Sequence, residues 1–513
     1  MIISKIEFDD KSVKLCNEEE LSNGNVFSVV IGVNASGKSR LLNKICNILM
    51  STNERLSHIY PNDDLSDKDF YISKYISKDY NEDGTLHYLN YTDKCQISYR
   101  RKIIDKAVKY ETSLKIDNHY HIVPMPKKLI SVSNCLFDKF PKENKKNDSF
   151  YSNKSSSNLN TNSKSMQISN SILNFVANNS IHVKETLNML NLESELTFNI
   201  NVHIKTKTLL GISEDLSLEV FDIENTVITC SKYDYALEEI DKSIVYESEW
   251  QYNIEKNKKE LVEIQDSIKF FLSYFFDSDI GESPYIHSEN KKNVKFKYNQ
   301  ENTNESILNA MKKLLFHGII STDDLSFFDS RNLKKTRISE KSSGELCYLH
   351  MITAIASEIR NNSIILIDEP ELSLHPKWQS EFIPFISKLF SKFNWCHFIF
   401  ATHSPHIVSS LSKVNSFVVN MTYDSHLPIK GIDVHNKSMD YQMAKVFGIS
   451  NPNNEYLIRI AINLFTFIST HKSMNKDKMD EYIFLIEISK DIDAKSALHD
   501  LIMAIKEMVE KYG

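Results

Sequence analysis

The sequence predicts an α/β fold: a mixed central sheet flanked by helices, with an inserted α+β unit and a helical C-terminal region. Two apolar strand patterns, 26–31 and 364–368, are typical of buried parallel strands, and the second ends in a carboxylate. Apolar residues alternate with polar ones at 196–204, 216–220 and 294–298, which indicates half-buried strands of a separate unit, and the apolar residues from 261 to 275 have helical spacing. From Ser438 onward the apolar spacing is helical.

The first strand pattern runs into residues 32–39, which fit G-x-x-x-x-G-K-[ST] at every position and precede a helical pattern. Glycines let such a loop curl so that its N–H groups point at a phosphate, and the helix N-terminus adds positive charge. Lys38 is expected to reach the β- and γ-phosphates, and Ser39 to ligate Mg²⁺. The candidate nucleotide-binding residues here are Gly32, Asn34, Ala35, Ser36, Gly37, Lys38, Ser39 and Arg40.

The strand pattern 364–368 ends in two adjacent carboxylates. Ligands of open α/β sheets bind at the carboxyl ends of the strands. Asp368 is therefore a candidate ligand of Mg²⁺, and Glu369 a candidate base that polarises a water against a phosphate. The alternative is an ordinary core strand that runs into a turn.

Two more segments could handle phosphate. Ser342, Ser343, Gly344 and Glu345 precede a helical run and lie about one helix and one turn before Asp368. A helix N-cap with an acidic first turn is the alternative interpretation of these four residues. His403 directly follows the apolar strand 398–400, one strand–helix–strand step after Asp368, so we expect it near the same phosphates.

Taken in their order along the chain (32–39, 342–345, 364–375 and 401–405), the four motifs resemble those of the ABC-type ATPase heads of the SMC, RecF and OLD superfamily. The resemblance implies ATP and Mg²⁺ as ligands, and a sandwich in which the signature 342–345 of one subunit caps ATP on the phosphate loop of another. It implies Glu369 as catalytic base, residues 373–375 as the D-loop and His403 as the switch histidine. The family's Q-loop glutamine has two candidates, Gln96 and Gln167.

Within that superfamily, His375, Pro376 and Gln379 resemble the H-P-x-x-Q continuation of anti-phage defence ATPases. Chain length and the helical tail resemble the ATPase subunit of Septu-type systems, also found attached to some retrons. That subunit works with a separate HNH nuclease. The resemblance therefore implies a homodimer or higher oligomer, a separate nuclease chain as effector, and DNA or a phage component as further candidate partners.

Four regions are expected from these patterns. Residues 1–142 form the N-terminal ATPase lobe, and 143–320 form a polar loop (143–165) followed by the inserted α+β unit. Residues 321–437 form the C-terminal lobe, with the signature, Asp368, the D-loop and His403. Residues 438–513 form a helical region that could dock a partner.

Composition narrows the function classes. The chain has 41% hydrophobic and 25% charged residues and a net charge of −7, which argues against a globally basic nucleic-acid binder. No apolar run approaches the ~20 residues that span a bilayer, and seven scattered cysteines fit a reducing compartment, so we expect a cytoplasmic protein without membrane contact. The only D-x-D after Ala401 is 491–493, with no strand before it, so a built-in metal-dependent nuclease is not expected.

Two other functions fit the same motifs. One is a RecF-like DNA-repair ATPase that binds DNA directly. The other is a scaffold that ATP locks together with little turnover. The leading hypothesis is an ATPase whose dimerisation controls an effector in phage defence.

Overall fold

The computed structural model divides the chain into two compact units, and each is described by itself. Unit 1 comprises residues 1–133, 139–141 and 360–513, and unit 2 comprises 134–138 and 142–359. The residues that the structure describes are 1–59, 69–74, 84–90, 93–104, 107–116, 125–135, 139–142, 150–155, 161–178, 187, 190, 192, 195–202, 263, 266, 267, 270, 271, 274, 275, 293–299, 304–316, 318–329, 334–422 and 427–512.

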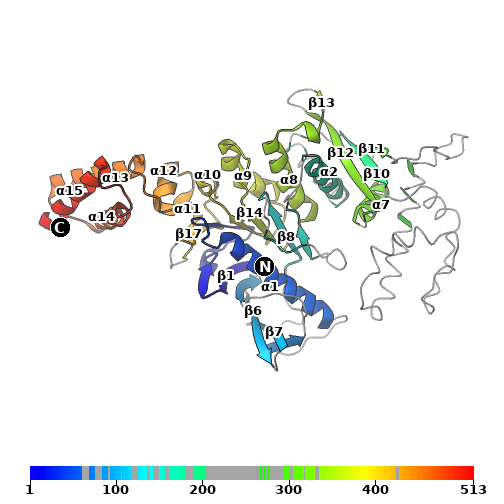
Figure 1. The fold of residues 1–513 in the computed structure, drawn as a ribbon, viewed down its shortest axis with the longest axis horizontal. Coiled ribbons are helices and arrows are strands. Elements are labelled where there is room, and N and C mark those ends of the chain that lie inside the picture. The colour runs from blue at the N-terminus through cyan, green and yellow to red at the C-terminus, as the bar shows by residue number, and fades with distance from the viewer. Residues whose placement is uncertain are drawn as a thin grey trace, which may run out of the picture. The chain divides into compact units, whose positions relative to one another are not determined.

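Unit 1 is built on a parallel sheet that runs β17-β16-β3-β15-β14-β8 (Figure 1). The central strands β3, β14 and β15 are buried along their whole length, because they consist largely of β-branched, leucine and phenylalanine residues. Between two of these strands, Phe27 stacks on Phe398 with ring centroids 5.0 Å apart. Only β17 pairs antiparallel. The strands are β3 (Val26–Ile31), β8 (Lys128–Ser133), β14 (Ser363–Asp368), β15 (His397–Ala401), β16 (Ser416–Asn420) and β17 (Ile429–Lys430). The mixed α/β class predicted from the sequence is confirmed.

Helices follow the strands of this sheet. The helix α1 (Lys38–Ile59) follows β3, α9 (Pro376–Leu389) lies between β14 and β15, and α10 (Pro405–Ser409) follows β15. Proline at the first turn of α9 and α10 suits a helix start, because the missing N–H would have no partner there. The carboxyl ends of β3, β14 and β15 therefore meet at one edge of the sheet.

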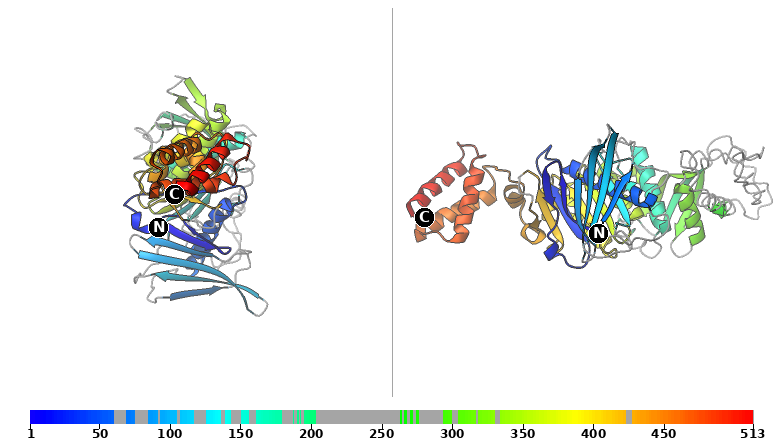
Figure 2. Two further views of the ribbon diagram at one scale, coloured as in Figure 1. Left: turned by 90° about the vertical axis from the view of Figure 1, so that its left-hand side faces the viewer. Right: turned by 90° about the horizontal axis from the view of Figure 1, so that it is seen from below.

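A second sheet of unit 1 is antiparallel, in the order β2-β1-β5-β6-β7-β4, and Figure 2 shows its long strands side by side. His397 fastens it to the parallel sheet: Ile3 N–H donates to its Nδ1 (3.1 Å), and its Nε2 lies 2.9 Å from Ser28 Oγ. The strands are β1 (Ile2–Phe8), β2 (Lys11–Lys14), β4 (Asp69–Lys74), β5 (Gly84–Asn90), β6 (Asp93–Ile104) and β7 (Ala107–Ile116), and a short 3₁₀ helix spans Glu18–Glu20.

Unit 2 holds an antiparallel sheet in the order β11-β10-β12-β13 and three described helices. The predicted strands near 196–204 and 294–298 are confirmed as β10 (Glu195–Val202) and β11 (Asn293–Asn299), whereas the predicted strand at 216–220 lies outside the described residues. The described residues between 263 and 275 are helical, as their spacing predicts. The other elements are β9 (Tyr151–Asn153), α2 (Thr161–Asn178), α7 (Glu305–Phe316), β12 (Ile320–Asp329), β13 (Lys334–Arg337), a 3₁₀ turn (Ile338–Glu340) and α8 (Ser343–Glu358).

Two expectations about this region need correction. The expected polar loop over 143–165 contains β9 and the first turn of α2. Ser152 in β9 and Ser165 in α2 are each only 2% exposed, so the polar composition of this stretch did not mark a loop there. Unit 2 also extends to residue 359, so the signature helix α8 belongs with the inserted unit, across the boundary expected at 320.

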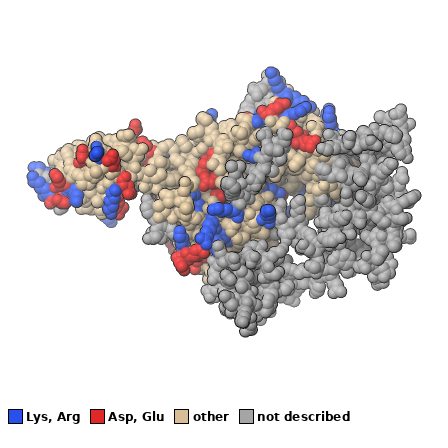
Figure 3. Space-filling model, viewed as in Figure 1, with Lys and Arg blue, Asp and Glu red and all other residues tan. Residues whose placement is uncertain are grey.

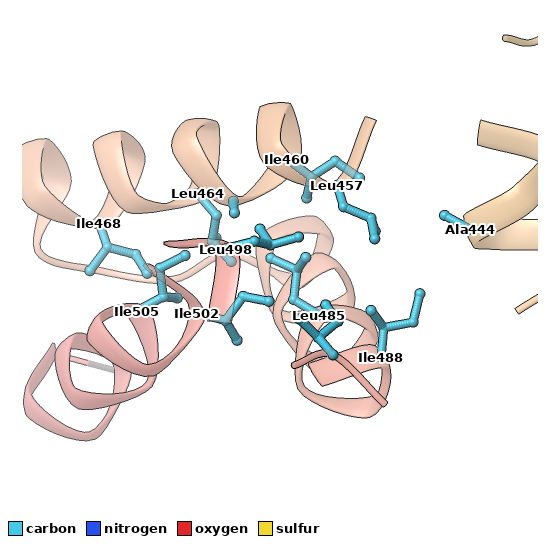
Figure 4. Packing of buried hydrophobic residues seen from close by; sticks show 12 residues of the cluster. Ala444, Leu457, Ile460, Leu464, Ile468, Leu485, Ile488, Leu498, Ile502 and Ile505 are labelled. Carbon is cyan, nitrogen blue, oxygen red and sulfur yellow. The ribbon is translucent and has the colours of Figure 1, made fainter. Parts of the chain in front are cut away.

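The C-terminal region of unit 1 is helical, as predicted. After α11 (Gly431–Val434), α12 (Met439–Tyr441) and a π-helix (Gln442–Val446), three longer helices pack together: α13 (Glu455–His471), α14 (Lys476–Ser489) and α15 (Ala497–Tyr512). Figure 4 shows Ile502 and Ile505 of α15 facing Leu464 and Ile468 of α13. The apolar stripe of the last helix is therefore core packing between these helices.

Asp491 and Asp493 are exposed in the turn between α14 and α15, away from any strand end. In the described part of the chain, no helix is both long and apolar enough to cross a membrane.

Candidate nucleotide-binding site

The phosphate loop joins β3 to α1 and has left-handed backbone at three positions. The φ angles are +153° at Gly32, +65° at Ala35 and +101° at Gly37. A Cβ at Gly32 would lie 2.6 Å from Ser36 Oγ, so both the backbone angle and the space require glycine there. This curl brings the loop's backbone around a small concavity at the start of α1, as phosphate binding requires.

Neighbouring elements hold the loop from two sides. Val33 N–H donates to Thr422 Oγ1 (3.1 Å), just past β16. From the β1–β2 turn, Asp9 pairs with Arg40 (3.0 Å) and Lys11 Nζ donates to Ser36 O (3.4 Å). The Arg40 side chain is therefore held by an ion pair with Asp9.

Lys38 lies under the loop and is only 5% exposed. Its ammonium donates to Gly32 O (3.0 Å) and Val33 O (3.4 Å) and lies 2.6 Å from Nε2 of His403. Burial lowers the pKa of Lys38, while Glu369, Asp368 and Glu371 act in the opposite direction. Burial and the nearby Lys38 charge lower the pKa of His403, so its neutral ring can accept this hydrogen bond.

Ser39 and Asp368 meet at the sheet edge: Ser39 Oγ donates to Asp368 Oδ1 (3.1 Å). A hydroxyl and a carboxylate are hard oxygen ligands, and Mg²⁺ is usually bound by one or two such groups together with phosphate oxygens and water. The described residues contain no group of three or more His, Cys, Asp or Glu side chains that could hold a metal. The hydroxyl of Ser39 and the carboxylate of Asp368, beside the phosphate loop, are oxygen ligands of the kind that fit Mg²⁺.

Glu369 follows β14 with a left-handed φ of +49°, and its N–H donates to Ala401 O (2.8 Å). Its carboxylate lies 3.4 Å from His403 Nε2. Burial is the first cause that raises the pKa of Glu369 to about 9, followed by the charge and hydrogen bond of Glu371 and the charge of Asp368. This environment therefore favours the protonated form of the Glu369 carboxyl group.

Glu371 is a site residue that the sequence analysis missed. It accepts hydrogen bonds from Thr402 Oγ1 (2.7 Å) and from His403 N–H (2.5 Å). These contacts fix the backbone that carries His403. The sequence signal for this residue was the second glutamate of the D-E-P-E run, two residues after Glu369.

The predicted D-loop lies between β14 and α9. Ser373 has a φ of +67°, and His375 caps α9 by accepting from Lys377 N–H. Gln379 of α9 donates to Leu374 O and accepts from Ser404 Oγ (2.6 Å), the N-cap residue of α10. The segment that follows His403 is thereby tied to α9.

The predicted signature residues lie in unit 2 at the start of α8. Ser342 is the N-cap, its Oγ accepts from Glu345 N–H (3.3 Å), and its own N–H donates to Glu345 Oε2 (3.0 Å). Ser343 and Gly344 form the first turn. The N-cap interpretation is therefore correct for this chain alone, and such a helix start also presents N–H donors that suit a phosphate.

Neither Q-loop candidate follows a strand of the parallel sheet. Gln96 lies in β6 and donates to Ser98 Oγ (3.0 Å), whereas Gln167 lies in α2 beside His350 Nε2 (3.2 Å). Of the two strands that pair with β14, β8 places Ser133 opposite Asp368. Neither Gln96 nor Gln167 therefore lies where a Q-loop glutamine is expected, after a strand of the parallel sheet.

Comparison with known proteins identifies the family. The family described as "AAA domain, putative AbiEii toxin, Type IV TA system" matches residues 117–409, which is more than half of the chain. The chain belongs to this family. The matched family is an ATPase domain, and residues 32–39 carry the phosphate-loop motif, so the chain is a P-loop ATPase.

Curated relatives include the "Retron Vc95 probable ATPase" of Vibrio cholerae, 24% identical over 38% of this chain and 34% of that protein. The "Retron Ec83 probable ATPase" of Escherichia coli is 25% identical over 39% of this chain and 36% of that protein. The chain thus matches about a third of the length of each. Among solved structures, the Pyrococcus furiosus Smc head domain covers 84% of this chain and 97% of its own, with 12% identity and a TM-score of 0.29.

Proposed function

We propose that this chain binds ATP with Mg²⁺, hydrolyses it to ADP and phosphate, and through this cycle controls a separate effector in an antiviral defence system. The observation that carries the proposal is that two groups of side chains lie at one sheet edge. His403 Nε2 lies 2.6 Å from Lys38 Nζ and 3.4 Å from Glu369 Oε1, and Ser39 Oγ donates to Asp368 Oδ1 (3.1 Å). Together they provide phosphate charge, metal ligands, a base and a γ-phosphate contact.

In the proposed reaction, ATP lies along the phosphate loop with its terminal phosphate toward His403. Lys38 leaves His403 and donates to the β- and γ-phosphates, where it stabilises the charge that develops on the leaving oxygen. Ser39 and Asp368 would hold Mg²⁺, whose charge would neutralise phosphate charge and lower the pKa of nearby Glu369. Asp368 and Glu369 thus have separate roles although they are adjacent.

The chemical step is attack of water on the γ-phosphorus. Glu369 accepts the proton of the water as its oxygen bonds to phosphorus, and the bond from phosphorus to the ADP oxygen breaks with its electron pair on ADP. Glu371 keeps the His403 backbone in place during this step. Each of these side chains comes from unit 1.

We further propose that the active form is a dimer or higher oligomer in which Ser342, Ser343, Gly344 and Glu345 of one copy cap the ATP of another. Support comes from the helix start at α8, because a helix N-terminus favours a phosphate, and from the motif order. The defence role is supported by the retron ATPase relatives, and a nuclease of HNH type is the effector we expect.

The test uses two variants with opposite expected behaviour. Lys38→Ala should abolish tight ATP binding in calorimetry, because it removes the phosphate charge. Glu369→Gln should retain ATP while hydrolysis falls by about 10²-fold or more, the usual cost of losing a general base. Near-normal ATP affinity of Lys38→Ala, or unchanged turnover of Glu369→Gln, would remove that residue from its role.

A further inference from the structure

The sheet of unit 2 has one packed face and one open face. Side chains on the packed face are almost completely buried, and Asn170 of α2 accepts from both N–H and Oγ1 of buried Thr322 in β12. The buried set is Leu196, Phe198, Phe296, Tyr298, Leu325 and Phe327. Because strand side chains alternate, the residues between them point to the other face.

The open face carries a row of polar and basic side chains across all four strands. In register, Lys297 pairs with Thr197, Thr197 with Ser326, and Ser326 with Arg337. Cross-strand neighbours lie roughly 5 Å apart, so two cations flank two hydroxyls in one line. A cation thus stands at each edge of the sheet.

Neighbouring rows repeat this chemistry. Lys295 pairs with Asn199, and Lys335 pairs with Phe328. Phe328 is 37% exposed, an uncommon state for a phenylalanine. Ser326 is only 9% exposed, so we define the basic sheet face by the other seven residues: Thr197, Asn199, Lys295, Lys297, Phe328, Lys335 and Arg337.

The charge of this face is not neutralised locally. Lys295, Lys297, Lys335 and Arg337 are exposed, and none forms an ion pair with another residue in the described part of the chain. Two described acids have contacts near these rows: Glu340 accepts from Arg337 N–H (3.2 Å), and Asp323, at the bulge of β12, accepts from Asn201. Figure 3 shows basic side chains gathered over β13 although the whole chain has a net charge of −7.

We propose that the basic sheet face binds single-stranded nucleic acid. Spread cations match a phosphate backbone, an exposed aromatic ring stacks a base, and hydroxyl and amide groups between the cations can hydrogen-bond to base edges. A duplex would offer the phosphates but keep its bases away from Phe328. The inference does not depend on the ATP site in unit 1.

The test is fluorescence anisotropy of the full chain with labelled 20-mers of thymidine, uridine, duplex DNA and an abasic strand, each over a range of salt concentrations. We expect the single strands to bind more tightly than the duplex or the abasic strand. The thymidine and uridine strands show whether DNA or RNA is preferred. No binding of any single strand at low salt, or equal binding of the abasic strand, would overturn the proposal.

Three variants locate the binding. Lys297→Glu with Arg337→Glu should weaken binding at least about tenfold and reduce the salt slope by about 1.4, since each single-strand phosphate contact contributes about 0.7. Phe328→Ala should weaken binding about tenfold without changing the slope. Lys334→Glu is the matched control: Lys334 is exposed beside Lys335 but outside the basic sheet face, and its change should alter affinity less than twofold.

ATP hydrolysis of every variant serves as the folding control and should stay at the wild-type level. Loss of binding in Lys334→Glu equal to that of the double variant would mean non-specific charge attraction and would overturn the assignment to this face. Failure of ATP hydrolysis in the wild-type chain would count against the proposed function and leave the binding result standing.

Discussion

At the residue scale, His397 shows how one buried ring joins two sheets. Ile3 N–H occupies its Nδ1, so the proton is on Nε2, which donates to Ser28 Oγ, and Ser28 donates onward to Leu15 O (2.8 Å). Burial first, and then the N-terminal charge, lower the pKa of His397 to about 3. A proton on Nδ1 would break the bond to Ile3.

Acid should therefore destabilise the chain through His397. The unfolded chain takes up a proton near pH 6.5 while the folded chain does not, so this contribution is present above pH 6.5 and is lost as pH falls toward 3. Between pH 7.5 and 5.5 the loss is about 1.4 kcal/mol for this group. Urea unfolding of His397→Gln should show a smaller decrease over this interval, and His471→Gln, on the exposed end of α13, should follow the wild type.

Glu371 is the second residue whose effect we can predict. Glu371→Gln puts an NH₂ group opposite one of two donors, so the His403 backbone shifts, and kcat should fall about 10²-fold, the typical cost of misplacing a catalytic group. The acidic limb of the kcat profile should also move to lower pH, because the Glu371 charge and hydrogen bond raise the pKa of Glu369. Steady-state kinetics check both, with exposed Glu381→Gln as control; an unshifted limb would contradict this role.

At the scale of elements, the end of β16 connects the phosphate loop to the C-terminal helices. Asn420 is 6% exposed, and its Oδ1 accepts from Thr422 N–H (2.8 Å) while its Nδ2 donates to Val446 O (2.7 Å) in the π-helix. Thr422 in turn accepts from Val33 N–H. Two residues thus link the loop at the nucleotide site to the segment that leads into α13.

Thr422→Val tests this link with an almost unchanged shape. It leaves Val33 N–H without its acceptor, and one hydrogen bond is worth about 0.5–1.5 kcal/mol, so ATP affinity should fall about 2- to 10-fold. Calorimetry measures it. Thr422→Ser keeps the hydroxyl and should bind ATP as the wild type does; equal losses in both variants would point to the methyl group instead.

The sequence predicts the centre of this site well because strand periodicity, together with the carboxyl-edge rule, places Asp368, Glu369 and His403 beside Lys38. It does not predict the pairing of β1 with β5, whose register is set across more than 70 residues. The role of Glu371 could not be predicted, because the direction of its side chain depends on the left-handed backbone at Glu369. The contact of Thr422 with the phosphate loop could not be predicted, because the spacing of apolar residues does not show which strand end lies beside the loop.

At the scale of the whole molecule, the proposed sandwich makes a prediction about mixtures. Lys38→Ala removes the phosphate loop's charge and Ser343→Arg blocks the α8 N-terminus, so each variant alone should be inactive. A mixed dimer contains one composite site with both halves intact. ATPase activity should partly return on mixing, and light scattering of Glu369→Gln with ATP should show at least a dimer. A monomer that hydrolyses ATP would contradict the sandwich.

The three contacts of the Lys38 ammonium also have a kinetic consequence. A lysine has three N–H donors, and here all three are occupied by Gly32 O, Val33 O and His403. ATP therefore enters a site whose main cation is already in use, and tight binding has to wait until Lys38 releases His403. Such a first-order step does not accelerate with ligand concentration, so the observed rate of ATP association should level off at high ATP. The separation of Lys38 from His403 would then limit the rate at which each cycle of ATP binding and hydrolysis begins.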